Sequence, residues 1–175
     1  MIIVYHGATC IVKQPLCLVG RPNLDFGQGF YVTNLREQAV NWAKRAANTG
    51  KAQWLNSYNL DIDKIKTNYR CLHFSAYDKD WLDFIVDCRN GNMPWQGYDF
   101  IEGGIADDRV VDTVNLYMLD MIPAETAIQR LAQHRPNNQI CLLSQQLINE
   151  CLNFINAEPL NNLSVGQKGG LYESE

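Results

Sequence analysis

The chain has 175 residues, of which 46% are hydrophobic and 19% charged, and its formal net charge is -4. This is the size and composition of one globular domain, which excludes a fibrous or disordered chain. The acidic balance also argues against generic electrostatic binding of nucleic acid, because proteins that bind phosphate backbones in this way usually present a basic face.

The first third of the chain predicts two short strands followed by a helix. Residues 2–5 are apolar and largely β-branched, which indicates a buried strand, and residues 30–33 predict a second strand after a loop rich in Pro, Gly and Asn. Asn34 and Glu37 have the spacing of a capping box, which predicts a helix over 34–48 with Trp42 on its apolar face.

The rest of the chain mixes strands and helices without regular alternation. The predicted elements are a strand at 54–60, a polar connection at 61–69, a strand at 71–74, a helix from Asp78 or Asp80 to Gly91, a strand at 98–105, helices at 110–121 and 123–132, a strand at 139–143, and a helix from Ser144 through Phe154. This order favours an α+β fold over a doubly wound sheet. Residues 1–156 form the predicted domain, and the polar composition of 157–175 predicts a flexible tail.

The cysteines and the hydropathy pattern indicate a reducing, cytoplasmic location. None of the six cysteines is in a C-x-x-C pair or near a His at zinc-ligand spacing, so neither a disulfide framework nor a metal cofactor is expected. The N-terminus lacks the pattern of a secretion signal, and no segment has the roughly 18 consecutive apolar residues of a membrane span, so no membrane partner is expected.

The first stretch with unusual local chemistry is Val4-Tyr5-His6-Gly7. A His at the end of a buried strand, followed at once by Gly, places an imidazole and an unhindered backbone at the rim of a cleft, where a flat ligand can approach closely. The alternative is a core histidine whose ring is satisfied by a backbone carbonyl, and the motif alone leaves both interpretations open.

The second stretch covers residues 21–33. Gly27 and Gly29 predict a tight turn with accessible amides, Tyr31 could present its ring to an aromatic ligand, and Arg21 could bind a phosphate. The glycines are not followed by Lys and Ser or Thr, so this is not a P-loop, and a strand rather than a helix follows, so it is not a Rossmann fingerprint. A structural turn with a buried aromatic pair is the alternative.

The third stretch begins the late strand with polar residues, Asn138 and Gln139 ahead of an apolar run. A side chain at such a position points to a strand end, where clefts are commonly built, although a simple surface position is the alternative. His73 and His134 have no acidic or thiol neighbours in sequence, and structural roles are expected for both.

Together these stretches resemble the ADP-ribosyltransferase superfamily, in the branch with a His-Tyr-Glu triad that includes diphtheria toxin and the poly(ADP-ribose) polymerases. The matching motifs are aromatic-His-Gly at 5–7, Gly-x-Gly-aromatic-Tyr at 27–31, and the start of the late strand at 138–141. More closely, the chain to about residue 156 resembles an uncharacterised bacterial family of that superfamily, through the segments 21–31 and 98–109 and a Gln-headed late strand.

The resemblance implies a split antiparallel β core with surrounding helices and NAD+ as co-substrate. It implies that His6 binds the adenosine ribose, that the Gly7 backbone pairs with the nicotinamide carboxamide, and that Tyr31 stacks on the nicotinamide ring. Arg21, Gly29 and Phe30 belong to the same expected NAD+-binding site. The expected activity is mono-ADP-ribosyl transfer to an unknown acceptor, which is a protein, a nucleic acid or a small molecule, and by analogy the chain is the toxin of a pair with an antitoxin.

One position departs from the family pattern. Gln139 stands where the triad has Glu, and an amide can hold a ribose hydroxyl but cannot offset a developing cation with full charge. Losing that charge could cost about 2–4 kcal/mol of transition-state stabilisation. Glu102, Asp107 and Asp108 are the candidates to replace it, and Asp107 is taken as catalytic. NAD+ hydrolysis, or binding of NAD+ or ADP-ribose without turnover, are the alternatives.

Overall fold

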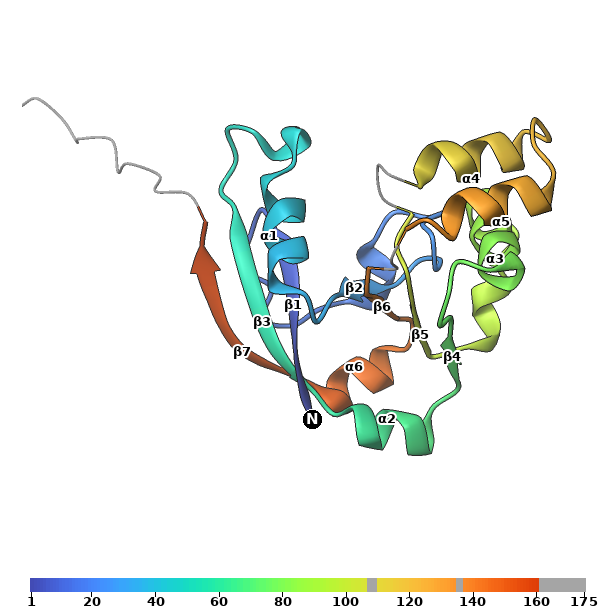
Figure 1. The fold of residues 1–175 in the computed structure, drawn as a ribbon. Coiled ribbons are helices and arrows are strands. Elements are labelled where there is room, and N and C mark those ends of the chain that lie inside the picture. The colour runs from blue at the N-terminus through green and yellow to red at the C-terminus, as the bar shows by residue number, and fades with distance from the viewer. Residues whose placement is uncertain (107–109, 135–136, 161–175) are drawn as a thin grey trace, which may run out of the picture.

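The structure, a computed structural model, describes residues 1–106, 110–134 and 137–160. Within these ranges the chain forms six α-helices, three short 3-10 helices and seven strands, so the predicted α+β fold is confirmed. In Figure 1 the molecule has two halves, each built on one sheet, which meet along strands β1 and β2.

The strands form two separate sheets. The first has the antiparallel order β1 (Ile2–Ala8), β3 (Trp54–Leu60), β7 (Leu152–Pro159). The second has the order β2 (Phe30–Val32), β6 (Gln139–Leu142), β5 (Phe100–Gly103), β4 (Cys71–His73). β4 and β5 run parallel, and the other strand pairs of the two sheets are antiparallel.

The helices cover the outer faces and the base of the two sheets. They are α1 (Arg36–Lys44), α2 (Ile62–Asn68), α3 (Lys79–Arg89), α4 (Val111–Met118), α5 (Ala124–Leu131) and α6 (Gln145–Cys151), with 3-10 helices η1 (Cys17–Val19), η2 (Ala46–Asn48) and η3 (Pro94–Gly97). Figure 1 shows α1 against the first sheet, α3, α4 and α5 beyond the second, and α2 and α6 below. No helix in the described parts of the chain has the length and hydrophobicity needed to span a lipid bilayer.

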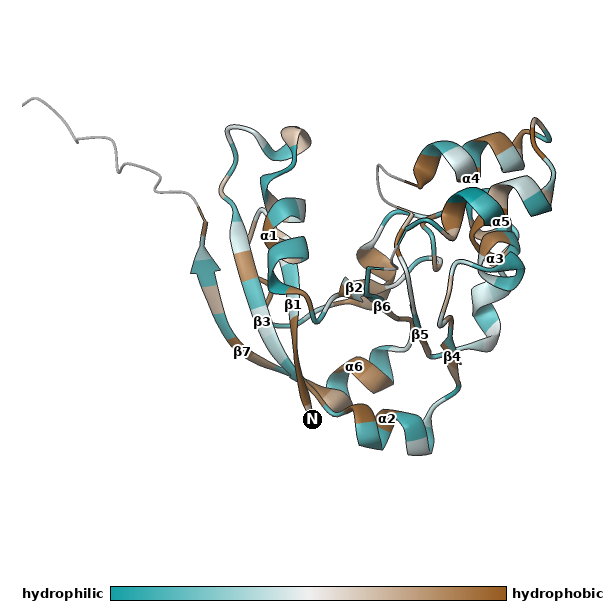
Figure 2. Ribbon diagram, viewed as in Figure 1, coloured by the Kyte–Doolittle hydropathy of each residue, from teal (hydrophilic) through white to brown (hydrophobic). Residues whose placement is uncertain are grey.

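Two hydrophobic cores lie on opposite faces of the second sheet, since successive side chains of a strand point to opposite sides. The inter-sheet core contains Phe30 and Ile140 together with α6 and residues of the first sheet. The helix-side core contains Ile101 and Cys141 together with α3, α4 and α5. The helices in Figure 2 accordingly carry both apolar and polar residues, as expected for elements that cover a core with one side.

The predicted start of the first helix is wrong in its detail. α1 begins at Arg36, and its N-cap is Leu35, which makes no side-chain capping hydrogen bond, so Asn34 and Glu37 do not form a capping box. Trp42 was expected on the buried face of this helix, but it is 51% exposed. The small residues Ala39 and Ala43 are buried there instead, because this face of α1 packs closely against β1.

Two other predicted elements are also corrected. The polar connection at 61–69 contains α2, which is capped by Asp61 through a 3.1 Å bond from the Lys64 amide. The last helix ends at Cys151, and the residues after it form β7, which pairs with β3 about a hundred positions earlier. β7 continues to Pro159, beyond residue 156, where the sequence indicated the start of a tail.

Replacing Gly7 by Ala tests how closely α1 packs on β1. A β-carbon at Gly7 would lie 2.0 Å from the carbonyl oxygen of Ala39, which is backbone and cannot rotate away. Overpacking typically costs about 1–3 kcal/mol, and we expect Gly7→Ala to lower the free energy of unfolding by about 3 kcal/mol in urea titrations. Gly97→Ala is the control, since nothing lies within 4 Å of its added carbon. Equal stability of the two variants would contradict this packing.

Candidate functional site

The two sheets are joined by a single described bridge between β1 and the end of β2. The Tyr5 amide donates to the Thr33 carbonyl at 2.7 Å, and the Thr33 amide donates to the Tyr5 carbonyl at 3.0 Å. An antiparallel ladder would next pair Gly7 with Tyr31, but no such bridge is formed. The strands therefore separate directly after Tyr5, and the split between the sheets begins there.

His6 lies where the ladder opens. Its Nδ1 is 2.7 Å from the carbonyl oxygen of Tyr31, which can only accept, so Nδ1 carries the proton and Nε2 has the free lone pair in the neutral ring. Burial lowers the pKa of His6 below its usual value and outweighs this hydrogen bond, which raises it. The ring is therefore neutral at pH 7, and no described residue bonds to Nε2.

The backbone of Gly7 faces the same opening. Peptide groups along a strand point alternately to its two edges, and those of Tyr5 point to β2. The amide and carbonyl of Gly7 point the same way, into the split, while its α-carbon packs against α1. Position 7 must therefore be glycine for α1 to pack this closely. The Gly7 amide and carbonyl leave one hydrogen-bond donor and one acceptor facing the split.

The rings of His6 and Tyr31 lie on opposite faces of β2. The imidazole packs on Phe30, with ring centroids 4.6 Å apart, and Phe30 belongs to the inter-sheet core. Tyr31 is the next residue of the strand, and its side chain packs against the helix-side core. The two predicted site residues are therefore brought together at the Tyr31 carbonyl and not by contact between their rings.

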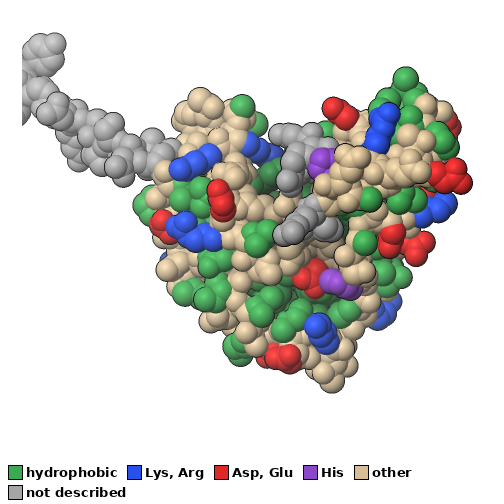
Figure 3. Space-filling model, in the orientation of Figure 1, with side chains coloured by type: hydrophobic (Ala, Val, Ile, Leu, Met, Phe, Trp, Pro, Cys, Tyr) green, Lys and Arg blue, Asp and Glu red, His purple; other side chains and the backbone are tan. Residues whose placement is uncertain are grey.

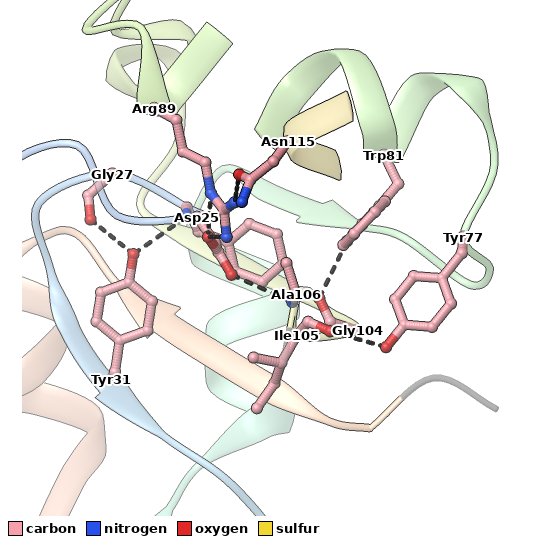
Figure 4. Close-up of polar contacts among 11 residues, drawn as sticks. Asp25, Gly27, Tyr31, Tyr77, Trp81, Arg89, Gly104, Ile105, Ala106 and Asn115 are labelled. Carbon is pink, nitrogen blue, oxygen red and sulfur yellow. Dashed lines mark hydrogen bonds and ion pairs between the residues drawn. The ribbon is translucent and has the colours of Figure 1, made fainter. Parts of the chain in front are cut away.

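The phenol of Tyr31 is held by the loop that precedes it. Its hydroxyl donates to the Gly27 carbonyl at 2.6 Å, as Figure 4 shows, and accepts from the Phe26 amide at 3.1 Å. Burial is the main reason that the pKa of Tyr31 lies well above 10.0. The ring is fixed in orientation, and its hydroxyl is already used within the protein. Tyr31 therefore has no free hydroxyl for a ligand.

A half-buried ion pair anchors that loop. Arg89 of α3 donates to Asp25 Oδ1 from Nε at 3.0 Å and from Nη2 at 2.8 Å, and Asp25 Oδ2 accepts from the Ala106 amide at 3.2 Å. The two side chains are 17% and 14% exposed. Figure 4 shows this cluster beside Tyr31, with Asn115 of α4 on the far side of Arg89. One carboxylate thus ties the Tyr31 loop to α3 and to the segment after β5.

Gln139 begins β6 beside the opening. Its Nε2 is buried and has no hydrogen-bond partner. Oε1 of Gln38, on α1, is also buried without a hydrogen-bond partner. The Asn138 carbonyl accepts from Gln38 Nε2 at 2.8 Å and from Thr33 Oγ1 at 2.7 Å, which ties the start of β6 to α1 and β2. Unpaired buried polar atoms are rare and costly, so this corner of the split has unused hydrogen-bonding capacity.

Glu102 is the predicted carboxylate that the structure does describe. Its carboxylate accepts from Asn138 Nδ2 at 3.1 Å and lies 3.4 Å from His73 Nδ1, and its side chain is 22% exposed. It lines a hollow of about 230 Å³ together with residues 73–75, 103–104 and 137–138. Glu102 pairs with Ile140 and Gly103 with Gln139, so the Glu102 carboxylate and the Gln139 side chain lie on opposite faces of the second sheet. In Figure 3 this face of the molecule is hollowed between the two halves.

Two further residues of the predicted NAD+-binding site lie on the loop before β2. Arg21 is exposed on this loop. A β-carbon at Gly29 would lie 2.5 Å from Cys141 Sγ, so this glycine is needed for packing on β6. Asp107, expected to be catalytic, and Asp108 lie outside the described residues. Sequence reasoning missed the role of Arg89, because its partner Asp25 is 64 positions away and no local motif links them.

The geometry defines an α+β protein with a split pair of sheets and a polar opening between them. The chain belongs to the family described as protein of unknown function (DUF3990), whose model matches residues 2–154. No curated protein and no solved structure matches the chain.

The lowered pKa of His6 predicts a loss of stability in acid. The unfolded chain binds a proton near pH 6.5 and the folded chain only at lower pH, so the stability contributed by neutral His6 is complete above that value and is lost as the pH falls below it. His6→Asn keeps a donor for the Tyr31 carbonyl but cannot titrate. We expect the urea midpoint to fall less between pH 7.5 and pH 5.5 in this variant than in the wild type. An equal fall in both proteins would show that protonation of His6 is not the cause of the lost stability.

The ion pair of Asp25 and Arg89 should contribute far more to the free energy of unfolding than an exposed ion pair does. Arg89→Met leaves the Asp25 carboxylate buried without a cation, and breaking a buried pair in this way costs about 3–5 kcal/mol. Arg36→Met is the control, because Arg36 and Glu158 are 50% and 53% exposed and such pairs contribute about 1 kcal/mol or less. Similar losses in the free energy of unfolding for both variants would show that the cluster is not an anchor.

Proposed function

We propose that the protein binds NAD+ in the opening between β1 and β2 and transfers ADP-ribose from it. The single observation that carries this proposal is the ladder that opens directly after the Tyr5–Thr33 bridge. His6 and Gly7 occupy one side of this opening and Tyr31 the other, which are the residues of the two motifs on which the resemblance to ADP-ribosyltransferases rests.

The residues at the opening fit the parts of NAD+. The Gly7 peptide group offers one donor and one acceptor, which is the complement of a carboxamide. The unbonded Nε2 of neutral His6 accepts a hydrogen bond and therefore suits a ribose hydroxyl. The fixed ring of Tyr31 offers a flat surface for a pyridinium ring. Each group is held by the protein before any ligand arrives, so little ordering is needed on binding.

Glu102 is the residue to which we assign the missing negative charge. Cleavage of the bond between nicotinamide and ribose develops positive charge on the ribose, and a fixed carboxylate stabilises such a transition state. Glu102 is held by Asn138, lies beside a hollow open to an acceptor, and pairs with Ile140, so its side chain is on the face of the second sheet that carries the inter-sheet core. It can also take the proton of the attacking acceptor, or of water if the reaction is hydrolysis.

A second candidate function is binding of NAD+ or ADP-ribose without turnover. It is favoured by Gln139, since the position of the triad carboxylate carries an amide whose Nε2 is buried and unpaired. Such a site could hold a ribose hydroxyl without assisting bond cleavage.

Nicotinamide release measured by chromatography, together with NAD+ binding measured by calorimetry, tests the proposal. We expect the wild type to release nicotinamide and Glu102→Gln to bind NAD+ normally but to release nicotinamide about 10²–10³ times more slowly. Glu125→Gln, on the exposed start of α5, is the matched control and should behave as wild type. Tyr31→Ala should weaken binding itself.

The outcomes separate the candidates. Tight NAD+ binding by the wild type with no nicotinamide release would favour the binding module. Release without any adduct would identify a glycohydrolase, and unchanged release by Glu102→Gln would remove that residue from the chemistry. Absence of NAD+ binding altogether would refute the proposal.

A further inference from the structure

The hollow beside Glu102 lies at one end of the second sheet, where β4 and β5 end and β6 begins. His73 pairs with Glu102 in the parallel ladder, and Glu102 pairs with Ile140 in the antiparallel one, so these three side chains share one face of the sheet. Among the described residues that line the hollow, Glu102 is the only carboxylate, and none is a lysine or an arginine. Figure 3 shows an acidic side chain next to a histidine on this hollowed face.

The Glu102 carboxylate has hydrogen-bonding capacity that the described protein does not use. An ionised carboxylate can accept about four hydrogen bonds, and Oε1 accepts one from Asn138 Nδ2 at 3.1 Å. His73 Nδ1 is 3.4 Å from Oε2, which is longer than the roughly 2.7–3.2 Å of an ordinary hydrogen bond. The side chains of Glu102 and His73 are 22% and 60% exposed, so the carboxylate is open to a ligand in the hollow.

Phe74 gives the hollow an apolar wall that is held in place without a ligand. Its ring centroid lies 5.2 Å from that of Phe84 and 6.0 Å from that of Phe26, and its amide donates to the Glu102 carbonyl at 2.8 Å. A β-carbon at Gly103 would lie 3.0 Å from Phe74 Cβ, so the glycine allows this wall to pack closely on β5. An apolar wall and a carboxylate therefore stand side by side before any ligand arrives, which lowers the ordering cost of binding.

The size and the charge of the hollow limit what it can bind. Its volume of about 230 Å³ is below the roughly 300–1,000 Å³ of pockets for drug-sized ligands, so it has room for one side chain and not for a nucleotide. The Glu102 carboxylate favours a cation and disfavours phosphates and other carboxylates. A basic side chain combines an aliphatic stem, which suits Phe74, with a charged head, which suits Glu102. Arginine fits better than lysine, because its planar fork matches a carboxylate and its guanidinium is less strongly hydrated.

We propose that this hollow binds the arginine side chain of a protein partner, with the guanidinium on the Glu102 carboxylate and the stem against Phe74. A side chain is the expected form of the ligand, because the hollow holds less than a whole drug-sized molecule and the rest of the partner contacts its rim. The proposal goes beyond the proposed function, since binding of a guanidinium requires neither NAD+ nor its cleavage.

Titrations of ¹⁵N-labelled protein with capped tripeptides, in the absence of NAD+, test this site. The probe has arginine between two glycines, and the reporters are the amides of Gly103 and Gly104 and the side-chain amide of Asn138, which line the hollow. We expect saturable shifts of these signals. The peptide with citrulline in place of arginine keeps the shape but lacks the charge, and it should bind at least about tenfold more weakly. The lysine peptide keeps the charge but loses the fork and should lie between the two.

Two variants of the protein locate the binding charge. Glu102→Gln keeps an acceptor for Asn138 but removes the charge, and it should weaken binding of the arginine peptide at least about tenfold. Glu125→Gln removes the same charge from the exposed start of α5 and should change the affinity no more than about twofold. Thermal unfolding of both variants shows that the fold is retained, and the comparison of peptides on the wild type does not depend on either variant.

The results distinguish this site from the proposed function. Arginine-peptide binding that depends on Glu102, in a protein that does not bind NAD+, would support the site while refuting the proposed function. Binding of NAD+ without any response to the arginine peptide would overturn this inference alone. Equal affinity for the arginine and citrulline peptides, or undiminished binding by Glu102→Gln, would also overturn it.

Discussion

The rest of the structure depends on how two sheets are joined and then separated. In the described residues a single bridge between Tyr5 and Thr33 joins them, and the ladder ends there, where the His6 ring takes the Tyr31 carbonyl. Burying a carbonyl without a hydrogen-bond partner costs free energy. The hydrogen bond from the His6 imidazole to the Tyr31 carbonyl therefore stabilises the separated strands. The same contact leaves the edge of Gly7 unpaired, which is the polar surface that a ligand can use.

The half of the molecule opposite α1 is held by longer-range contacts. Asp25 receives donors from α3 and from the segment after β5, and Trp81 Nε1 donates to the Gly104 carbonyl at 3.0 Å. The Tyr31 loop and the segment after the strand that carries Glu102 are therefore both tied to α3. The α1 half contributes His6 and Gly7 from the other side, so the proposed site combines groups from both halves.

Much of the fold could be predicted where the signal is local. The strand before His6 and the Asp78 cap of α3 follow from short patterns, and the cap forms a 2.9 Å bond from the Trp81 amide. β7 could not be predicted, because its apolar residues follow a helical segment directly and its partner strand is distant in sequence. The site divides in the same way. The motifs locate His6 and Tyr31, but nothing in the sequence indicates that Arg89 fixes the Tyr31 loop.

The central claim is that the opened ladder is the ligand site, and the amide signal of Gly7 reports on it directly. In a titration of ¹⁵N-labelled protein with NAD+, the account predicts saturable shifts of the Gly7 amide and of the His6 ring nitrogens, with little change at the exposed residues Leu16, Leu18 and Val19. Saturable shifts located elsewhere, with Gly7 unaffected, would contradict it.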